Sequence, residues 1–277
     1  MVLKALDSEF WLAVKRGAES AAAGKATLGI VAPDREINID QQVSMIEDQV
    51  SRGVAALVLA PAASAQVIPA LEKAAERGIP VIIVDTDVDW PKKITYVGTD
   101  NYQGGKLAGQ FLVDNLSGPA EVGLITGIPG EETHEGRKRG FKEALAGAPR
   151  LKLVAEQPAN SERALALNVM ENMLTARPTL AAVFATSDQM ALGALEAIQA
   201  RRSGLPVKLV SFDAGSEVLS LIRQGKVGAV VAQRPFQMGV RGVEAALRAI
   251  ARQPVDRVID TGTQLVTRAN VESFRSE

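Results

Sequence analysis

The feature that most constrains the fold is an alternation of short apolar runs with longer, helix-length segments. Runs rich in Val, Ile and Leu recur at residues 27–31, 56–59, 81–84, 122–125, 151–154, 182–184, 207–210 and 227–231. Segments between them, such as 10–22 and 42–52, carry apolar residues at three- and four-residue steps, which is typical of helices packed on one face. Apolar strands linked by helices indicate parallel sheets covered on both faces, so the sequence predicts a doubly wound α/β protein.

The second half of the chain repeats features of the first half. Lys15-Arg16-Gly17 returns as Lys138-Arg139-Gly140 at an offset of 123 residues. Asp85, which ends one expected strand, is matched by Asp213 at an offset of 128 residues. Agreement in order and spacing over this length predicts two lobes of like topology. With 277 residues, the chain is long enough for each lobe to bury its own core.

Composition excludes several classes of function. The net charge of −1 provides no surplus of Lys and Arg to neutralise phosphates, so we expect no nucleic-acid partner. The chain has no cysteine and a single histidine, His134. This excludes Cys-rich and multi-histidine metal centres, and we expect neither a metal nor a cofactor. His134 itself is expected in the loop or first turn of a helix, at the surface by default, with the edge of a cleft as the alternative.

The apolar runs and the first residues bear on location. The longest apolar runs, such as residues 55–63, are too short to span a bilayer. The chain starts with Met1-Val2-Leu3 and shows no basic segment followed by an apolar stretch and a small-residue cleavage site. The sequence therefore leaves two expectations: a cytoplasmic protein, or an exported one whose signal has been removed.

Polar or turn-forming residues follow the expected strands. They are Asp7-Ser8, Asp85-Thr86-Asp87, Gly127-Ile128-Pro129, Ser187-Asp188 and Phe212-Asp213. Ligands of open α/β sheets bind beyond the carboxyl ends of the strands, so two such lobes facing each other would form a cleft lined from both sides. Neither Gly-x-Gly-x-x-Gly nor Gly-x-x-x-x-Gly-Lys-Ser/Thr occurs, which predicts a binding surface made of side chains rather than of phosphate-binding loops.

Several longer motifs resemble those of one family, the ribose-type periplasmic sugar-binding proteins, which are the type 1 solute-binding proteins of ABC transporters. The motifs are Ser8-Glu9-Phe10-Trp11, residues 53–61, Gly78-Ile79-Pro80-Val81, Thr99-Asp100-Asn101, Gly104-Gly105-Lys106, Gly127-Ile128-Pro129-Gly130, residues 188–194 and Phe212-Asp213. The resemblance runs nearly end to end. It implies two Rossmann-like lobes, 1–99 plus 235–261 and 100–234 plus 262–277, with a ligand cleft between them. Three hinge strands would cross near 99–101, 233–235 and 260–263.

The resemblance also implies how a sugar would be held. Phe10 and Trp11 fall where the family packs aromatic rings against the sugar, and Asp85, Arg137 and Asp213 match its charged hydroxyl-binding positions. A guanidinium fork and two carboxylates suit a rim of hydroxyls. Each assignment has an alternative: the aromatic residues could belong to the core, the aspartates could cap helices, and Arg137 could be solvated.

Further candidates match family positions but differ in residue type. Gln233 matches a contact near a hinge, and Ser8 belongs to the first motif. Relative to the ribose pattern, Ala60 and Ser187 replace asparagines, Thr86 replaces an arginine, Ser161 replaces an aromatic residue, and Lys4 stands where a small polar residue is usual. Because a site that bonds a particular hydroxyl discriminates steeply, these changes favour a hexose, a substituted sugar or a sugar alcohol over ribose.

The expected function is therefore that of the substrate-binding component of an ABC-type carbohydrate importer, a periplasmic monomer that closes over a sugar and docks on a membrane permease. We expect no enzymatic activity. Asp100 and Asn101 are expected to cap a helix and brace a hinge. One alternative is the effector-binding core of a lactose-repressor-type regulator without its DNA-binding headpiece. Another is a glycosidase that uses Asp85 and Asp213, which we consider less suitable because Arg137 would keep both ionised.

Overall fold

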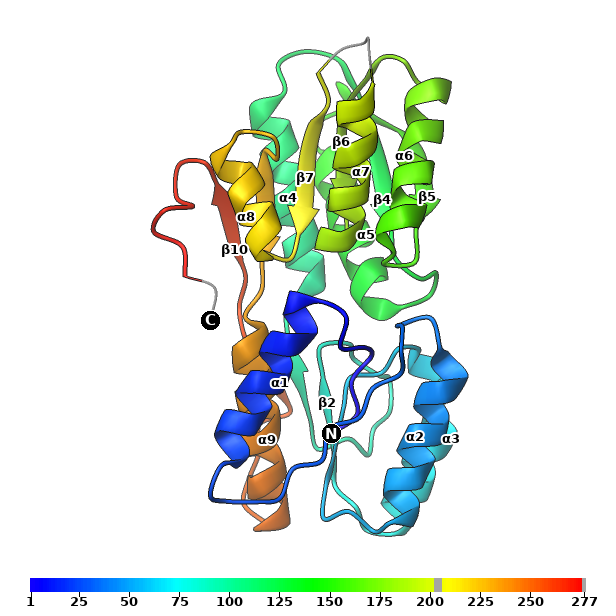
Figure 1. The fold of residues 1–277 in the computed structure, drawn as a ribbon, viewed down its shortest axis with the longest axis vertical. Coiled ribbons are helices and arrows are strands. Elements are labelled where there is room, and N and C mark those ends of the chain that lie inside the picture. Colours follow the sequence, from blue (N-terminus) through cyan, green and yellow to red (C-terminus); the bar gives the residue numbers. More distant parts are fainter. Residues whose placement is uncertain (202–205, 276–277) are drawn as a thin grey trace.

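The computed structural model describes residues 1–201 and 206–275 and has two lobes stacked along its longest axis (Figure 1). Each lobe has its own sheet, and the two sheets share no strand. We call them the lower and upper lobes, as they lie in Figure 1. Among the described residues, no helix combines the length and apolar character needed to cross a bilayer.

The lower lobe is built on a parallel sheet with the order β1-β2-β3-β9. Its strands are β1 (Leu57–Leu59), β2 (Val81–Val84), β3 (Thr95–Gly98) and β9 (Val258–Asp260). Its helices are α1 (Glu9–Ala22), α2 (Ile39–Ser51), α3 (Ser64–Glu76) and α9 (Pro235–Ile250). Beyond β1, Val2 forms isolated parallel bridges with Leu59 and Val31. The strand expected at residues 27–31 is thus reduced to a single bridge at Val31.

The upper lobe is built on a larger sheet with the order β10-β8-β7-β6-β4-β5. Its strands are β4 (Ala120–Thr126), β5 (Leu151–Pro158), β6 (Leu180–Ala185), β7 (Lys208–Phe212), β8 (Ala229–Ala232) and β10 (Gln264–Thr267). Its helices are α4 (Asn101–Asn115), α5 (Glu132–Ala146), α6 (Arg163–Ala176), α7 (Asp188–Ala200) and α8 (Ser216–Arg223). The other strands pair in parallel, whereas β10 runs antiparallel to β8.

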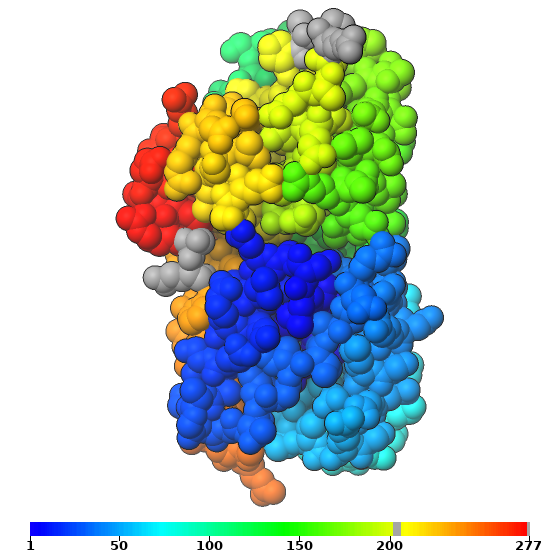
Figure 2. All heavy atoms as spheres, viewed as in Figure 1, coloured from blue at the N-terminus to red at the C-terminus, as the bar shows by residue number. Residues whose placement is uncertain are grey.

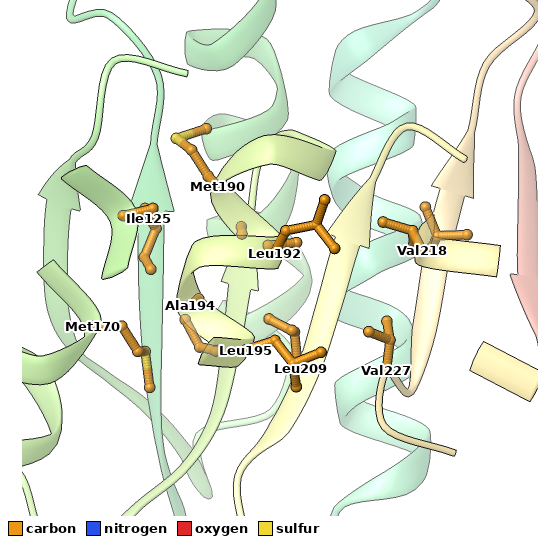
Figure 3. Packing of buried hydrophobic residues seen from close by; sticks show 14 of the residues in the cluster. Ile125, Met170, Met190, Leu192, Ala194, Leu195, Leu209, Val218 and Val227 are labelled. Carbon is orange, nitrogen blue, oxygen red and sulfur yellow. The ribbon is translucent and has the colours of Figure 1, made fainter. Parts of the chain in front are cut away.

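Helices cover both faces of the upper sheet, as the apolar strand pattern predicts. On one face, α6, α7 and α8 enclose a core that includes Met170, Leu195 and Leu209 (Figure 3). On the other face, α4 and α5 enclose a second core that contains Phe141 and Phe184, with ring centroids 4.9 Å apart. The expected doubly wound α/β fold is confirmed.

The repeated Lys-Arg-Gly triplet marks the same packing site in each lobe. A Cβ atom on Gly17 of α1 would lie 2.0 Å from the carbonyl oxygen of Phe236 in α9. A Cβ atom on Gly140 of α5 would lie 1.9 Å from the carbonyl oxygen of Tyr102 in α4. Only a residue without a side chain permits such close helix contact, so the repeat in the sequence reflects a repeated helix pair.

The chain crosses between the sheets three times, through β3 to α4, β8 to α9, and β9 to β10. These crossings lie within the regions expected for the hinge. Two of them are bonded to each other, because the Thr261 amide and hydroxyl both donate to the Gly98 carbonyl, at 2.8 and 3.0 Å.

Candidate ligand-binding cleft

A cleft of about 680 Å³, counting its open mouth, lies where the carboxyl ends of both sheets face each other. In Figure 2 the lobes meet closely on the front face, with N-terminal residues against the upper lobe. All but one of the binding residues expected from the sequence line this cleft: Lys4, Ser8, Phe10, Trp11, Asp85, Arg137, Ser161, Ser187, Asp213 and Gln233.

Asp85 and Asp213 occupy equivalent positions in the two lobes. Both have a left-handed backbone, with φ of 65° and 68°, which is unfavourable for a residue other than glycine. Each amide donates across its sheet, Asp85 to the Val97 carbonyl at 2.9 Å and Asp213 to the Val231 carbonyl at 3.0 Å. The backbone therefore turns identically after each strand and directs both residues to the cleft. Neither aspartate is a helix N-cap, which removes that alternative.

Lys4 is the centre of a buried network that joins the lobes. Its ammonium lies 2.7 Å from Glu131 Oε1 and 3.2 Å from Asp85 Oδ2. The Thr86 hydroxyl lies 2.8 Å from Glu131 Oε1 and 2.7 Å from the Thr133 hydroxyl. Lys4, Asp85 and Thr86 belong to the lower lobe, whereas Glu131 and Thr133 belong to the upper. Thr86 is fully buried in this network and is not among the residues that line the cleft, and its contact with a ligand stays a prediction.

The network keeps Lys4 and Glu131 ionised. Burial acts against both charges, but the Lys4 ammonium, aided by His134, keeps the pKa of Glu131 well below its usual range. Burial likewise opposes the charge of Lys4, yet Glu131 and Asp85 raise the pKa of Lys4 above its usual value. The interlobe contact is therefore a true ion pair at neutral pH.

Arg137 is buried and held from several sides. It donates from Nη1 to the Thr186 carbonyl at 2.7 Å and from Nε to Asn101 Oδ1 at 2.9 Å. Its guanidinium lies 3.7 Å from the centroid of the Phe212 ring, and Nη1 lies 3.7 Å from Asp213 Oδ2. With 3% of its surface exposed, Arg137 is not the solvated residue of the alternative interpretation.

Asp100 and Asn101, the two residues after β3 that were expected to cap a helix and brace a hinge, have separate roles. Asp100 caps α4, because its carboxylate accepts from the Gln103 amide at 3.0 Å. Asn101 does not cap a helix but orients Arg137 through the bond described above. A residue beside the hinge thus positions a cleft side chain.

The aromatic side of the cleft comes from α1. Trp11 is 3% exposed and donates from Nε1 to Glu36 Oε1 at 2.7 Å. Phe10 meets it edge-on, with centroids 4.9 Å apart and planes at 89°. Ser8 caps the helix, since its hydroxyl accepts from the Trp11 amide at 3.4 Å. Trp11 therefore serves both the core and the cleft wall, so the two interpretations from the sequence are compatible.

His134 is not at the surface, and the expectation that it would be was wrong. It lies in the first turn of α5, 5% exposed, and lines the cleft. Its Nδ1 lies 2.8 Å from Thr186 Oγ1 and its Nε2 lies 3.1 Å from Ser161 Oγ. Burial lowers the pKa of His134 to about 3. The helix begins at Glu132 and turns His134 and Arg137, three residues apart, towards the same side.

Buried carboxyl groups line the upper wall. Burial raises the pKa of Asp188 to about 7, with a further contribution from the nearby Asp213. Burial also raises the pKa of Asp213, although Arg137 and Gln233 oppose the change. Burial thus has a larger effect on the pKa of Asp213 than the opposing Arg137 guanidinium, whose Nη1 lies 3.7 Å from Oδ2.

The serines of the upper lobe are held differently. Ser187 caps α7, accepting from the Met190 amide at 3.4 Å. Ser161 follows Asn160, and both have left-handed backbones, with φ of 61° and 52°. Gln233 donates to Asp213 Oδ1 at 2.6 Å, while its own Oε1 is buried and has no partner among the described residues.

Several cleft-lining residues are not assigned a ligand contact from the sequence. They are Asp7, Arg35, Glu36, Ile37, Thr133, His134, Asn160, Glu162, Asp188 and Gln189. Asp7 and Asp188 are nevertheless among the polar strand-end residues from which the cleft is predicted. Arg35 and Glu162 lie in loops without such a signal and meet across the lobes at 3.1 Å. Within residues 1–201 and 206–275, no group of His, Cys, Asp and Glu side chains is arranged to hold a metal ion.

Two facing α/β lobes, three crossings and a polar cleft between the lobes define a periplasmic-binding-protein fold. Residues 1–254 match the family described as periplasmic binding protein domain, and the chain belongs to that family.

Individual relatives match over nearly the whole chain. The ribose import binding protein RbsB of Bacillus subtilis is 34% identical over 263 residues, covering 95% of this chain and 85% of that protein. A solute-binding protein from Agrobacterium vitis, solved with bound D-fucose, is 30% identical with a TM-score of 0.94, covering 98% and 95% of the two chains. Another from Actinobacillus succinogenes, solved with bound D-allose, is 31% identical with a TM-score of 0.92, covering 99% and 98%.

Proposed function

We propose that this protein is the substrate-binding component of an ABC-type carbohydrate importer. The observation that carries the proposal is the matched pair Asp85 and Asp213, which reach one cleft from the ends of two separate sheets. Two carboxylates and the Arg137 guanidinium suit the hydroxyls of a sugar, and Phe10 and Trp11 suit its apolar faces. The names and bound sugars of the relatives support the same function.

The proposed ligand contacts are the cleft-lining residues expected from the sequence. They are Lys4, Ser8, Phe10, Trp11, Asp85, Arg137, Ser161, Ser187, Asp213 and Gln233. The proposed lobes are 1–99 plus 235–261 and 100–234 plus 262–277, of which 202–205 and 276–277 lie outside the described residues.

The proposed mechanism is closure about the three crossings. A sugar binds one lobe of an open form, the lobes rotate together, and the other lobe completes the enclosure. Contacts that join the lobes, such as Lys4 with Glu131 and Arg35 with Glu162, belong to the closed arrangement. Because the ligand touches both lobes only when closed, it shifts the population towards that state.

The proposed ligand is a monosaccharide-sized sugar or derivative, with a hexose favoured over ribose. Ser161 and Ser187 present only short hydroxyl side chains to the cleft. The D-allose and D-fucose bound to two relatives are compatible with a six-carbon ligand. A ribose affinity tighter than that for every hexose tested would contradict this preference.

We further propose that the protein acts in the periplasm as a monomer and docks on a membrane permease, without changing its ligand chemically. Similarity to an import binding protein supports this over the effector-binding core of a transcription regulator.

A thermal-shift screen against pentoses, hexoses, sugar alcohols and small glycosides tests the function, since a ligand bound only by the folded state raises the melting temperature. We expect a selective rise for a hexose-sized sugar that is lost in Asp85→Asn and in Asp213→Asn. The matched control is Asp114→Asn, a carboxylate on the outside of α4. No shift with any sugar would contradict the proposal.

A further inference from the structure

A second cavity lies beside the cleft, between the start of α1 and the upper lobe. Its volume is about 750 Å³, counting its opening. Four residues, Phe10, Asp188, Asp213 and Gln233, line both this cavity and the cleft. The two spaces are therefore separated by no more than one layer of side chains, and a group in one lies next to a molecule in the other.

The walls of the second cavity are mixed: Glu9, Arg16, Asp188, Asp213 and Gln233 make one part polar, and the rest of the lining is apolar. Phe10, Leu12 and Ala13 contribute from α1, while Ala214 and Pro235 contribute from the opposite side. Leu12 is 40% exposed, one of few large apolar side chains in the described chain with so much surface in water. Apolar surface gains about 25 cal/mol for each Å² removed from water, so a weakly polar group would be stabilised here.

The lobes also meet at the border of this cavity. Glu9, the first residue of α1, accepts a hydrogen bond from the Ser216 amide at 2.8 Å and another from the Ser216 hydroxyl. Glu9 thereby caps α8 from the opposite lobe, where the N-cap residue, Gly215, has no side chain. The cavity consequently keeps defined walls in the closed form.

The layer between the two spaces contains an unused acceptor. Gln233 is 6% exposed, and its amide nitrogen is bound to Asp213 Oδ1 at 2.6 Å. Its Oε1 is buried without a partner among the described residues. An unsatisfied buried acceptor is destabilising, so a donor supplied by a ligand at this layer would be favoured.

We propose that this cavity is a second subsite, and that the ligand is a glycoside or similarly substituted sugar whose weakly polar substituent lies against Phe10, Leu12 and Ala214. The substituent leaves the sugar at the Gln233 layer, where a neighbouring sugar hydroxyl donates to Oε1. This inference rests on the proposed function, because the sugar ring must occupy the main cleft.

Calorimetric titration of the whole protein with D-allose, D-galactose and D-glucose, each alone and as its phenyl α- and β-glycosides, tests the subsite. At least one phenyl glycoside should bind about tenfold or more tightly than its parent sugar, in line with the apolar area buried. Ala214→Leu, which fills the cavity, should abolish that advantage and leave the parent sugar within about twofold, and Ala214→Ser should preserve both.

A second variant, Leu12→Ser, removes apolar surface from the α1 wall of the second cavity without filling the cavity. Leu12→Ser changes an exposed side chain, so folding should be unaffected, and it should lower the affinity for the phenyl glycoside alone, by about threefold or more. If parent sugars bind but every glycoside binds no better, or if Ala214→Leu weakens parent and glycoside equally, the subsite is wrong while the sugar-binding function stands. If neither parents nor glycosides bind, the proposed function itself fails.

Discussion

Lys4 and Glu131 form a buried ion pair, with Nζ 2.7 Å from Oε1, although they come from opposite lobes and are 127 positions apart in the sequence. Opening of the cleft would separate them. Because Lys4 also lies 3.2 Å from Asp85 Oδ2, the same ammonium links closure to the orientation of a proposed ligand-binding carboxylate.

Glu131→Gln should weaken ligand binding by about 10- to 100-fold, since it leaves the Lys4 ammonium with one buried carboxylate instead of two. Titration calorimetry measures the affinity, and small-angle scattering with saturating sugar measures compaction. Glu132→Gln is the matched control, because Glu132 pairs with Arg139 at the surface. Equal affinities for the two variants would show that Glu131 does not contribute to closure.

His134 should make the folded protein sensitive to acid. The unfolded chain binds a proton near pH 6.5, whereas burial keeps the folded-state pKa at about 3. Between these values the unfolded state holds more protons, so this contribution to stability is complete above pH 6.5 and is lost as the pH falls. Lowering the pH from 6.5 to 5 should therefore reduce the free energy of unfolding by about 2 kcal/mol through His134.

Urea denaturation between pH 5 and 8 measures the effect of His134. His134→Gln should be less stable at pH 7, because its bonds to Ser161 and Thr186 are altered, but should lose less stability on acidification. A slope against pH equal to that of the unmodified protein would rule out the assigned role.

Asp188 should have the opposite effect on stability from His134, because it favours the folded state at low pH. Burial and the facing Asp213 raise the pKa of Asp188 from 3.8 to about 7 in the folded protein. The folded state therefore binds the extra proton, and this contribution is greatest below about pH 4 and is lost as the pH rises towards 7. Asp188→Asn, melted without ligand across this range, should gain stability relative to the unmodified protein with rising pH. Parallel melting curves at every pH would contradict this assignment.

The paired glycines should be intolerant of even one methyl group. Gly17→Ala and Gly140→Ala should each lower the free energy of unfolding by about 1–3 kcal/mol, since the added carbon meets a backbone carbonyl of the partner helix. Gly147→Ala is the control, because its nearest neighbour would be 3.5 Å away and its φ is −71°. Chemical denaturation provides the comparison, and three variants of similar stability would contradict close packing at these sites.

The alternation of apolar runs predicted the fold class. The Asp85 and Asp213 repeat predicted that the cleft lies at the carboxyl ends of the strands of both sheets. These features are local, because burial selects apolar residues along a strand and each strand end must turn. The polar strand ends and the family resemblance together predicted about half of the cleft-lining residues, whose contact with a ligand stays a prediction. It could not detect that residues 27–31 form only one bridge, since pairing depends on the neighbouring strand as well as on the residues themselves.

By itself, then, the sequence determined two α/β lobes and the polar strand ends that face each other, and the family resemblance added where the chain crosses between the lobes. Only the tertiary structure decided that Thr86 is buried in a network between the lobes, that His134 faces inward, and that Lys4 pairs with Glu131. The physical reason is that local patterns record the burial of apolar residues in strands and helices, but not which polar side chains are buried with them. Which distant group satisfies a buried charge depends on how two separately folded lobes come together.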